Sequence, residues 1–312
     1  MGDALTAPAR ILVLGHTGQV ASALRYGDWP SDIVVETRGR ASLDLLRPQS
    51  VLPVINSGNW AAVVNAAAYT QVDEAEKDSR SAYLVNRDAP AEVARACAQL
   101  DIPLVHLSTD YVFDGTRASP YDEGARVQPL SVYGASKAAG EQAVRAQLSR
   151  YVILRTSWVF GPVGHNFVIA MLALARERDD VFVVNDQYGR PTAAQDIADA
   201  IIGIVRALLH GKTCGYGTFH FANRGTTNWY EFAREVFRQA ERRGVSRTPQ
   251  VTPIPAAARS AQAERPMNSE LDTTKIEQVY GVLPRHWQAS LAQTLDRVIG
   301  PVGSTREGEG VK

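Results

Sequence analysis

A regular alternation of short, mostly apolar runs with helix-like segments fills the first half of the sequence and constrains its fold more than any other feature. The apolar runs lie at 11–14, 33–35, 61–65, 103–108 and 151–155, and helix-like segments lie at 21–26, 48–55, 81–100 and 137–148. Runs that are apolar at successive positions predict strands buried on both faces, as in parallel sheets covered by helices on both sides. The pattern therefore predicts an α/β fold of the Rossmann type, with a doubly wound parallel sheet.

The second half keeps this rhythm less regularly. A strand is expected at 181–184 and helices at 195–209 and 229–243, whereas 244–270, rich in Pro, Ala and Arg, is expected to be loop. We expect residues 1–160 to form the Rossmann domain, with a segment at about 193–222 returning to it. Residues 161–301 are expected to form mainly a smaller α/β lobe, and 302–312 a flexible tail.

Length and composition exclude several classes of protein. The chain has 312 residues, which suggests about two domains, and its 33 basic and 33 acidic residues lack the positive excess typical of nucleic-acid-binding proteins. Two cysteines are too few for a disulfide framework or a cysteine zinc site. Because no targeting segment and no apolar stretch of about 18 residues stands out, we expect a cytoplasmic protein with neither a nucleic-acid nor a membrane partner.

The turn after the first predicted strand has the spacing Gly-x-x-Gly-x-x-Ala, formed by Gly15, Gly18 and Ala21. In a dinucleotide-binding turn the first glycine permits tight bending, the second lets the backbone approach a pyrophosphate, and the third small residue allows helix–strand packing. The helix N-terminus then offers N–H groups to the anion. Any strand-to-helix turn can use glycine, so the position in the first βα unit is what indicates a dinucleotide site.

Charged residues follow the second predicted strand, where folds of this type distinguish their cofactors. Glu36 can bind a ribose 2′-hydroxyl, whereas Arg38 and Arg40 can pair with a 2′-phosphate. The two arginines favour NADPH, and Glu36 leaves NADH possible. The alternative interpretation of each arginine is a solvated loop charge.

The sharpest chemical signal is Tyr-Gly-Ala-Ser-Lys at 133–137, at the start of a predicted helix. Tyr133 and Lys137 then lie on one helix face. A nearby ammonium favours phenolate and lowers the pKa of a tyrosine, so the pair could pass a proton to a carbonyl oxygen. Thr109 ends a predicted strand upstream, where α/β sheets place their sites, and its hydroxyl could bind the same oxygen.

These residues lie in longer strings through which the chain resembles the dTDP-4-dehydrorhamnose reductase family, a branch of the extended short-chain dehydrogenases/reductases. The matching strings lie at 15–20, 64–76, 107–115, 129–137, 155–161, 185–192, 226–232, 265–272 and 283–287. The string Ser-Thr-Asp-Tyr-Val-Phe-Asp-Gly at 108–115 is specific for this branch, whereas the glycine spacing is not. The resemblance covers about residues 10–300.

The resemblance implies NAD(P)H-dependent reduction of the C4 ketone of a dTDP-4-keto-6-deoxy sugar, first of all dTDP-4-dehydro-L-rhamnose, in a pathway that supplies rhamnose to surface polysaccharide. The implied catalytic residues are Thr109, Tyr133 and Lys137. The implied cofactor-binding residues are Gly15, Thr17, Gly18, Gln19, Val20, Arg38, Asp44, Ala66, Ala67 and Ala68, with Tyr133 and Lys137. The implied substrate-binding residues are Asp110, Tyr111, Trp158, Arg265 and Asn268.

Some members of the family dimerise around a metal held by glutamates, and this chain departs from them. Ala23 and Gln195 stand where two of these glutamates are expected. The six histidines also show no metal-ligand spacing. We therefore expect no metal and a monomer or a weak homodimer. The expected binding partner is the substrate, a dTDP-sugar.

Related enzymes leave other functions open. Dehydratases of this fold need a carboxylate pair after the threonine, and Tyr111 replaces the second carboxylate, which disfavours dehydration. Another sugar-nucleotide 4-ketoreductase or an epimerase remains an alternative. A non-catalytic nucleotide-binding regulatory subunit is a third possibility, against which the intact Thr109, Tyr133 and Lys137 argue.

Overall fold

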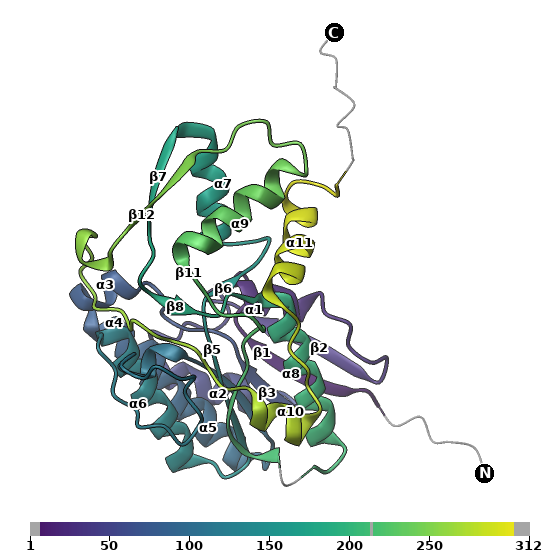
Figure 1. Cartoon of the computed structure of the whole chain (residues 1–312). Helices are drawn as coiled ribbons and strands as arrows, with labels where there is room; N and C mark the ends of the chain where they lie inside the picture. The colour runs from purple at the N-terminus through teal and green to yellow at the C-terminus, as the bar shows by residue number, and fades with distance from the viewer. Residues whose placement is uncertain (1–6, 213–214, 303–312) are drawn as a thin grey trace.

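The computed structural model describes residues 7–212 and 215–302, so the expected tail lies outside the described residues except for residue 302. A six-stranded sheet forms its centre, in the order β10-β5-β4-β3-β1-β2, and every neighbouring pair is parallel (Figure 1). Its strands are β1 (Ala9–Leu14), β2 (Ile33–Arg38), β3 (Ala62–Asn65), β4 (Leu104–Thr109), β5 (Tyr151–Thr156) and β10 (Gly217–His220).

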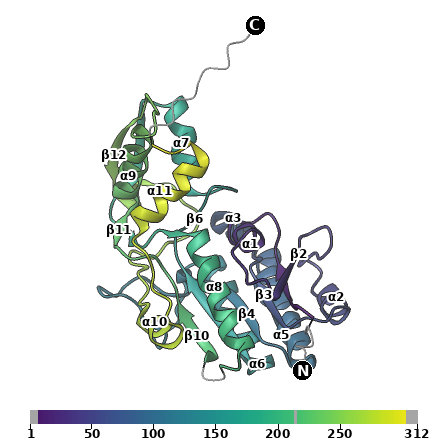
Figure 2. The ribbon, with the colours of Figure 1, turned by 90° about the vertical axis from the view of Figure 1, so that its right-hand side faces the viewer.

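Successive residues of β1 face opposite sides of the sheet, as the two-residue period of a strand requires. Ile11 and Val13 are buried in one core with helices α1 (Gln19–Arg25) and α8 (Ala194–Leu209), and Figure 2 shows α8 along this face. Leu12 and Leu14 are buried in a second core with α2 (Val51–Asn56), α5 (Ala89–Gln99) and α6 (Val132–Gln147). The predicted doubly wound α/β fold is confirmed.

The chain leaves this sheet after β5 and later returns to it. Helix α8 packs against α1, and β10 then pairs with β5 at the sheet edge. A later helix, α10 (Thr274–Tyr280), contacts both α8 and β10 and buries Ile276 in the same core. The central layer therefore draws on three separate parts of the sequence.

A second lobe carries its own apolar core above the strand ends. It contains α7 (Phe167–Glu177), α9 (Trp229–Glu241), α11 (Trp287–Val298) and the parallel pair of β7 (Asp180–Val184) with β12 (Gln250–Ile254). The expectation that 244–270 is all loop was wrong, because β12 lies within it. Pro253 lacks a backbone N–H, but β12 pairs only with β7 among the described strands, so one of its edges needs no donor.

Short elements connect the lobes and line the strand ends. β6 (Val159–Phe160) pairs with β9 (Thr192–Ala193), and β8 (Tyr188–Gly189) pairs with β11 (Thr227–Asn228). Helices α3 (Val72–Lys77) and α4 (Ser79–Tyr83) follow β3. Within the described ranges, no helix combines the length and apolar character needed to cross a membrane.

Candidate active site

The three predicted catalytic residues come together at the carboxyl end of β4. Thr109 is the last residue of β4, while Tyr133 and Lys137 lie one turn apart near the start of α6. Ser131 fixes where α6 begins, because its side chain accepts a hydrogen bond from the N–H of Gly134 at 3.2 Å. Ligand sites in parallel α/β sheets lie at such strand ends.

Gly134 explains why this helix can approach β4 so closely. A side-chain carbon at this position would lie 2.2 Å from the carbonyl oxygen of Tyr111, closer than atoms can pack. The glycine inside Tyr-Gly-Ala-Ser-Lys therefore allows α6 to bring Tyr133 against the segment after Thr109.

Burial dominates the electrostatics of Tyr133. Its side chain is 9% exposed, and burial raises the pKa of the phenol, while a hydrogen bond with Thr109 lowers it in part. The sequence-based expectation that the Lys137 ammonium lowers this pKa does not describe this structure. The Nζ atom of Lys137 instead donates to the carbonyl oxygen of Leu107 at 2.7 Å, and burial lowers the pKa of Lys137 to about 8.

Sequence reasoning missed two residues near Lys137. These are Glu141 and Arg155, which form a buried ion pair. Glu141 lies one further turn along α6 and is fully buried, where Arg155 donates to both of its carboxylate oxygens at 2.8 and 2.7 Å. Ser108 donates to the same carboxylate at 2.6 Å. A glutamate four residues after Lys137, on a helix face that must be buried, is the signal that could have revealed this pair.

Asp110 lies next to Thr109 and is buried with an incomplete set of partners. The Thr109 hydroxyl donates to Asp110 Oδ1 at 2.9 Å, whereas Oδ2 has no hydrogen-bond partner among the described residues. Burial raises the pKa of this carboxyl to about 7, against the lowering effect of hydrogen bonds from Ser269 and Thr109. A buried oxygen without a partner is available to a ligand.

Tyr111 and Arg265 lie together on the other side of Tyr133. The rings of Tyr111 and Tyr133 meet edge to face with centroids 5.5 Å apart. Arg265 hydrogen-bonds Tyr111 and forms an ion pair with Asp73 of α3 at 2.7 Å, so the second half of the chain crosses the first half here. Asn268 is turned away from this group, since its side-chain amide donates to the backbone of Arg117 at 2.8 Å.

Trp158 has an unusual backbone conformation beside these residues. Its φ angle is +46°, a left-handed value that bulky residues rarely adopt. The indole stacks on Trp229, with centroids 3.6 Å apart, and its Nε1 donates to the Ser269 hydroxyl at 3.0 Å. The sequence predicted neither of these partners, although Trp229 lies in one of the matching strings.

The glycine turn after β1 has the shape expected of a dinucleotide site. Gly15 has a φ of +116°, and a side-chain carbon there would lie 3.0 Å from Cβ of Ala21, so both positions need small residues. A side-chain carbon at Gly18 would meet nothing within 4 Å. Thr17 and Gly18 are exposed, Val20 is buried, and Gln19 Oε1 is a buried atom without a partner among the described residues.

The loop after β3 runs beside this turn. Ala66 donates its N–H to the carbonyl of Leu14 at 3.0 Å, and Ala67 donates to the side chain of Asn65 at 3.2 Å. Asn86 holds the far end of the loop, since it bonds the N–H and carbonyl of Tyr69 at 2.9 and 3.0 Å. Ala66, Ala67 and Ala68 therefore present small side chains next to the glycine turn.

Glu36 and two arginines lie together where the adenosine end of the cofactor is expected. Arg38 forms an ion pair with Glu36 at 3.0 Å, and Arg10 pairs with the same carboxylate. The hydrogen bond and charge of Arg10, with a smaller contribution from Arg38, lower the pKa of Glu36. Asp44 caps a turn by accepting the N–H of Leu46 at 3.1 Å, so in this structure its carboxylate serves the local backbone.

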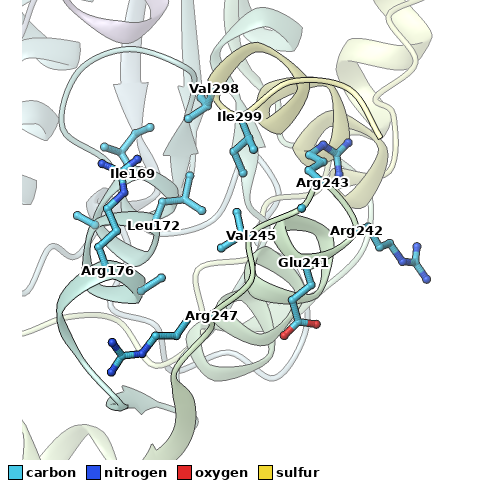
Figure 3. Close-up of a pocket in the computed structure, with 13 residues that line it drawn as sticks. Ile169, Leu172, Arg176, Glu241, Arg242, Arg243, Val245, Arg247, Val298 and Ile299 are labelled. Carbon is cyan, nitrogen blue, oxygen red and sulfur yellow. The ribbon is translucent and has the colours of Figure 1, made fainter. Parts of the chain in front are cut away.

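A separate cavity of about 790 Å³ lies in the second lobe, between α7, the turn after α9 and the end of α11 (Figure 3). Its apolar wall is formed by Ile169, Leu172, Val245, Val298 and Ile299. Two arginines at its rim serve neighbouring groups, because Arg247 pairs with Asp179 and Arg243 donates to backbone carbonyls at 2.9 Å. None of the predicted site residues lines this cavity.

Over 7–212 and 215–302, no group of three or more His, Cys, Asp or Glu side chains is arranged to hold a metal ion. The position expected for a bridging glutamate, Gln195, instead bonds Asp199 at 2.9 Å and Arg297 at 3.2 Å.

Known proteins resemble this chain over nearly its whole length. Residues 9–299 match the family model described as the RmlD substrate binding domain. The dTDP-4-dehydrorhamnose reductase of Aggregatibacter actinomycetemcomitans is 40% identical over 292 residues, covering 91% of this chain and 97% of the relative. That of Sinorhizobium fredii is 41% identical, covering 90% and 95%. The solved dTDP-4-dehydrorhamnose reductase of Bacillus anthracis, in complex with NADP, superposes with a TM-score of 0.85 at 34% identity, covering 92% and 99%.

Proposed function

The chain belongs to the dTDP-4-dehydrorhamnose reductase family, and from this premise we propose that it reduces the C4 ketone of dTDP-4-dehydro-L-rhamnose with NADPH, giving dTDP-L-rhamnose. The observation that carries the proposal is the meeting of Thr109, Tyr133 and Lys137 at the end of β4. Two hydroxyl groups and an ammonium in one buried group suit the reduction of a carbonyl.

The proton chemistry follows from the burial of Tyr133. When bound, NADPH supplies the hydride that C4 receives. Tyr133 is a protonated phenol at neutral pH and so carries a proton for the C4 oxygen, although burial raises its pKa and makes it a weaker acid than an exposed phenol. Thr109 bonds Tyr133, and its single proton, which goes to Asp110 Oδ1 in this structure, would have to turn to the C4 oxygen for both hydroxyls to polarise the ketone.

Lys137 has a different part in this scheme. Its ammonium is fixed by the carbonyl of Leu107 and directed by α6 to the same strand end as Tyr133. From there it would hold the nicotinamide ribose by hydrogen bonds. The negative charge of Glu141 opposes the effect of burial and favours the charged form of Lys137.

The residues present fit a dinucleotide cofactor. The small residues Gly15 and Ala21 allow the tight turn, and the open space at Gly18 leaves room for a pyrophosphate. We assign residues 1–160 and 193–222 to cofactor binding and 161–301 mainly to substrate binding, with α10 as the part of the latter that packs on the central sheet. Arg38 and Arg265 are the guanidinium groups that would receive the 2′-phosphate of NADPH and the diphosphate of the substrate.

The sugar would lie between the strand end and the second lobe. Asp110 and Tyr111 lie next to Tyr133 there, and Trp158 is hydrogen-bonded to Ser269. The oxygen of Asp110 that has no partner meeting full hydrogen-bond geometry among the described residues can accept a sugar hydroxyl. Tyr111 stands where dehydratases of this fold need a second carboxylate, which supports reduction rather than dehydration. As to setting, we propose a cytoplasmic enzyme, monomeric or weakly dimeric, that needs neither nucleic acid nor membrane.

A direct assay tests the proposed function. Purified protein with NADPH and dTDP-4-dehydro-L-rhamnose is expected to consume NADPH, and NMR of the product is expected to show the L-rhamno configuration. Heat-denatured protein is the blank, and dTDP-4-keto sugars of other configuration report on selectivity. Consumption without the L-rhamno product would assign the chain to another ketoreductase.

The activity should depend on pH through Lys137. Burial lowers the pKa of Lys137 to about 8, so its ammonium is present below that pH and is lost as the pH rises through it. We expect kcat/KM for NADPH to fall about tenfold per pH unit above this value. Lys137→Arg, whose charge persists at these pH values, should lack this decline in whatever activity it retains. A flat wild-type profile up to about pH 9.5 would contradict the assignment.

Cofactor preference should depend on Arg38. Arg38→Ala is expected to raise KM for NADPH about 10- to 100-fold and to leave KM for NADH within about twofold, because a charged hydrogen bond to the 2′-phosphate is lost. Arg10→Ala is the matched control, since Arg10 pairs with the same Glu36 but lies near the start of β1, whereas Arg38 is the last residue of β2. Equal changes for both cofactors in Arg38→Ala would show that Arg38 does not bind the 2′-phosphate.

A further inference from the structure

We propose that Ser269 is a positioning residue of the sugar pocket, whose hydroxyl joins the indole of Trp158 to the carboxyl group of Asp110. The indole and the carboxyl group would then hold one fixed geometry beside Thr109. This inference rests on the proposed function, because it assigns the sugar to the space around these groups.

The first argument is that several contacts hold Trp158 in an unfavourable backbone conformation. A φ of +46° is unfavourable for a residue with a bulky side chain, so the surroundings must impose it. Trp229 stacks on the indole at 3.6 Å with planes 7° apart, and at Gly189 a side-chain carbon would lie only 2.5 Å from the indole. Ser269 adds a directional contact to the indole, the 3.0 Å hydrogen bond from Trp158 Nε1.

The second argument concerns the single proton of the Ser269 hydroxyl. A hydroxyl donates once and accepts twice, and one acceptor place is taken by the Trp158 indole. The proton has two candidate acceptors. One is the carbonyl of Tyr188, at a long 3.4 Å, and the other is the neighbouring carboxyl of Asp110, whose pKa Ser269 lowers against the effect of burial. Asp110 Oδ2 is buried without a partner meeting full hydrogen-bond geometry among the described residues, so it gains more than the Tyr188 carbonyl from a bond with the Ser269 hydroxyl.

The third argument is continuity with the reacting groups. Thr109 donates to the other oxygen of Asp110 at 2.9 Å and also bonds Tyr133. With the proposed contact between Ser269 and Asp110, hydrogen bonds would run from Trp158 through Ser269 and Asp110 to Thr109. The charge of Asp110 raises the pKa of the phenols of Tyr111 and Tyr133, which shows that both lie close to this carboxyl.

The backbone of Ser269 is itself fixed, which a positioning residue requires. Its N–H donates to the carbonyl of Tyr188 at 2.9 Å, and the preceding residue, Asn268, donates its N–H to Gly115 at 3.1 Å. The side chain of Ser269 is 2% exposed. Its hydroxyl is therefore held at one place between the two lobes.

Kinetics of Ser269→Ala test the proposal. We expect KM for the sugar nucleotide to rise about 5- to 20-fold, because the indole of Trp158 loses its hydrogen bond to Ser269. KM for NADPH should stay within about twofold, because the cofactor site is unchanged. Ser157→Ala is the matched control, since that buried hydroxyl next to Trp158 donates only to the backbone of Arg190, at 2.9 Å. An unchanged KM for the sugar in Ser269→Ala, or an equal rise in Ser157→Ala, would overturn the proposal.

A spectroscopic measurement tests the same bond without activity. The chain has five tryptophans, and the indole N–H signal of Trp158 in ¹⁵N-labelled protein is the one lost in Trp158→Phe. In Ser269→Ala this signal is expected to move upfield and to exchange faster with water, while the other indole signals stay in place. An unmoved signal would refute the role of Ser269. If the wild type binds the sugar nucleotide without reducing it, the proposed function fails. The indole signal of Trp158 would still show whether Ser269 bonds the indole.

A double-mutant cycle completes the test and guards against unfolding. If the two side chains act through one bond, Ser269→Ala and Trp158→Phe together should raise KM no more than the larger single change. Circular dichroism and NADPH titration establish that each variant is folded. Multiplicative effects on KM would mean that the two residues act independently, against the proposal.

Discussion

Tyr133→Phe is expected to lower kcat by about 10²- to 10⁴-fold, with NADPH affinity within about twofold of the wild type. The change removes one buried oxygen and keeps the ring, so the edge-to-face contact with Tyr111 survives. Thr109 remains and can still polarise the ketone, but an aliphatic hydroxyl is a far weaker acid than a phenol. The measurement is steady-state consumption of NADPH together with a binding titration.

The matched control for this change is Tyr121→Phe. Tyr121 is also a buried phenol, which donates to Asp114 at 2.8 Å and stacks on Phe113 in a cluster of buried residues that does not include Tyr133. Its kcat should stay within about twofold, at a stability cost of about 1 kcal/mol for the lost hydrogen bond. Turnover by Tyr133→Phe within tenfold of the wild type would show that another group supplies the proton.

Glu141→Gln is expected to lower the free energy of unfolding by about 3–5 kcal/mol, because it leaves the buried guanidinium of Arg155 without its counter-charge. Glutamine keeps the shape of glutamate, so the change tests charge rather than volume. Burial raises the pKa of Glu141, but the hydrogen bonds and charge of Arg155 lower it more, to about 2. The folded pKa is therefore below the unfolded one, and this contribution to stability should be complete above about pH 4.5 and disappear as the pH falls towards 2.

Urea denaturation measures the effect, and Glu74→Gln is its control. Glu74 pairs with Lys77 at 3.4 Å on the surface, where both side chains are more than half exposed. Removing that charge should cost no more than about 1 kcal/mol. If Glu141→Gln costs as little as Glu74→Gln, the buried pair does not hold α6 against β5.

The first half of the fold could be predicted because its signals are local. The apolar runs of β1, β3, β4 and β5 are largely buried, so the sequence shows them directly, and the Gly15 turn carries its own conformational requirement. β12 escaped prediction because Pro253 argues against a strand, and only the unpaired edge beside β7 makes it tolerable. Such an edge is a property of the assembled sheet and cannot be read from the segment alone.

The site also contains residues that local sequence could identify and residues that it could not. Tyr133 and Lys137 are one helical turn apart, so their spacing identified them, whereas Ser269 reaches Trp158 across 111 positions of sequence. The pKa of Tyr133 was also misjudged from sequence. Proximity to Lys137 was visible there, but the burial that raises the pKa depends on the packing of α6 against the segment after β4.

The discontinuous central sheet has a consequence for how such a chain can be cut or recombined. A fragment ending near residue 160 would lack α8 and β10, which cover Ile11 and Val13 and pair with β5. Its apolar face would be open to water and its last strand would offer a bare edge to other molecules, so it would aggregate rather than persist as an independent nucleotide-binding module. The first 160 residues must therefore be produced together with the rest of the chain, because a cut there divides the central layer rather than separating two modules.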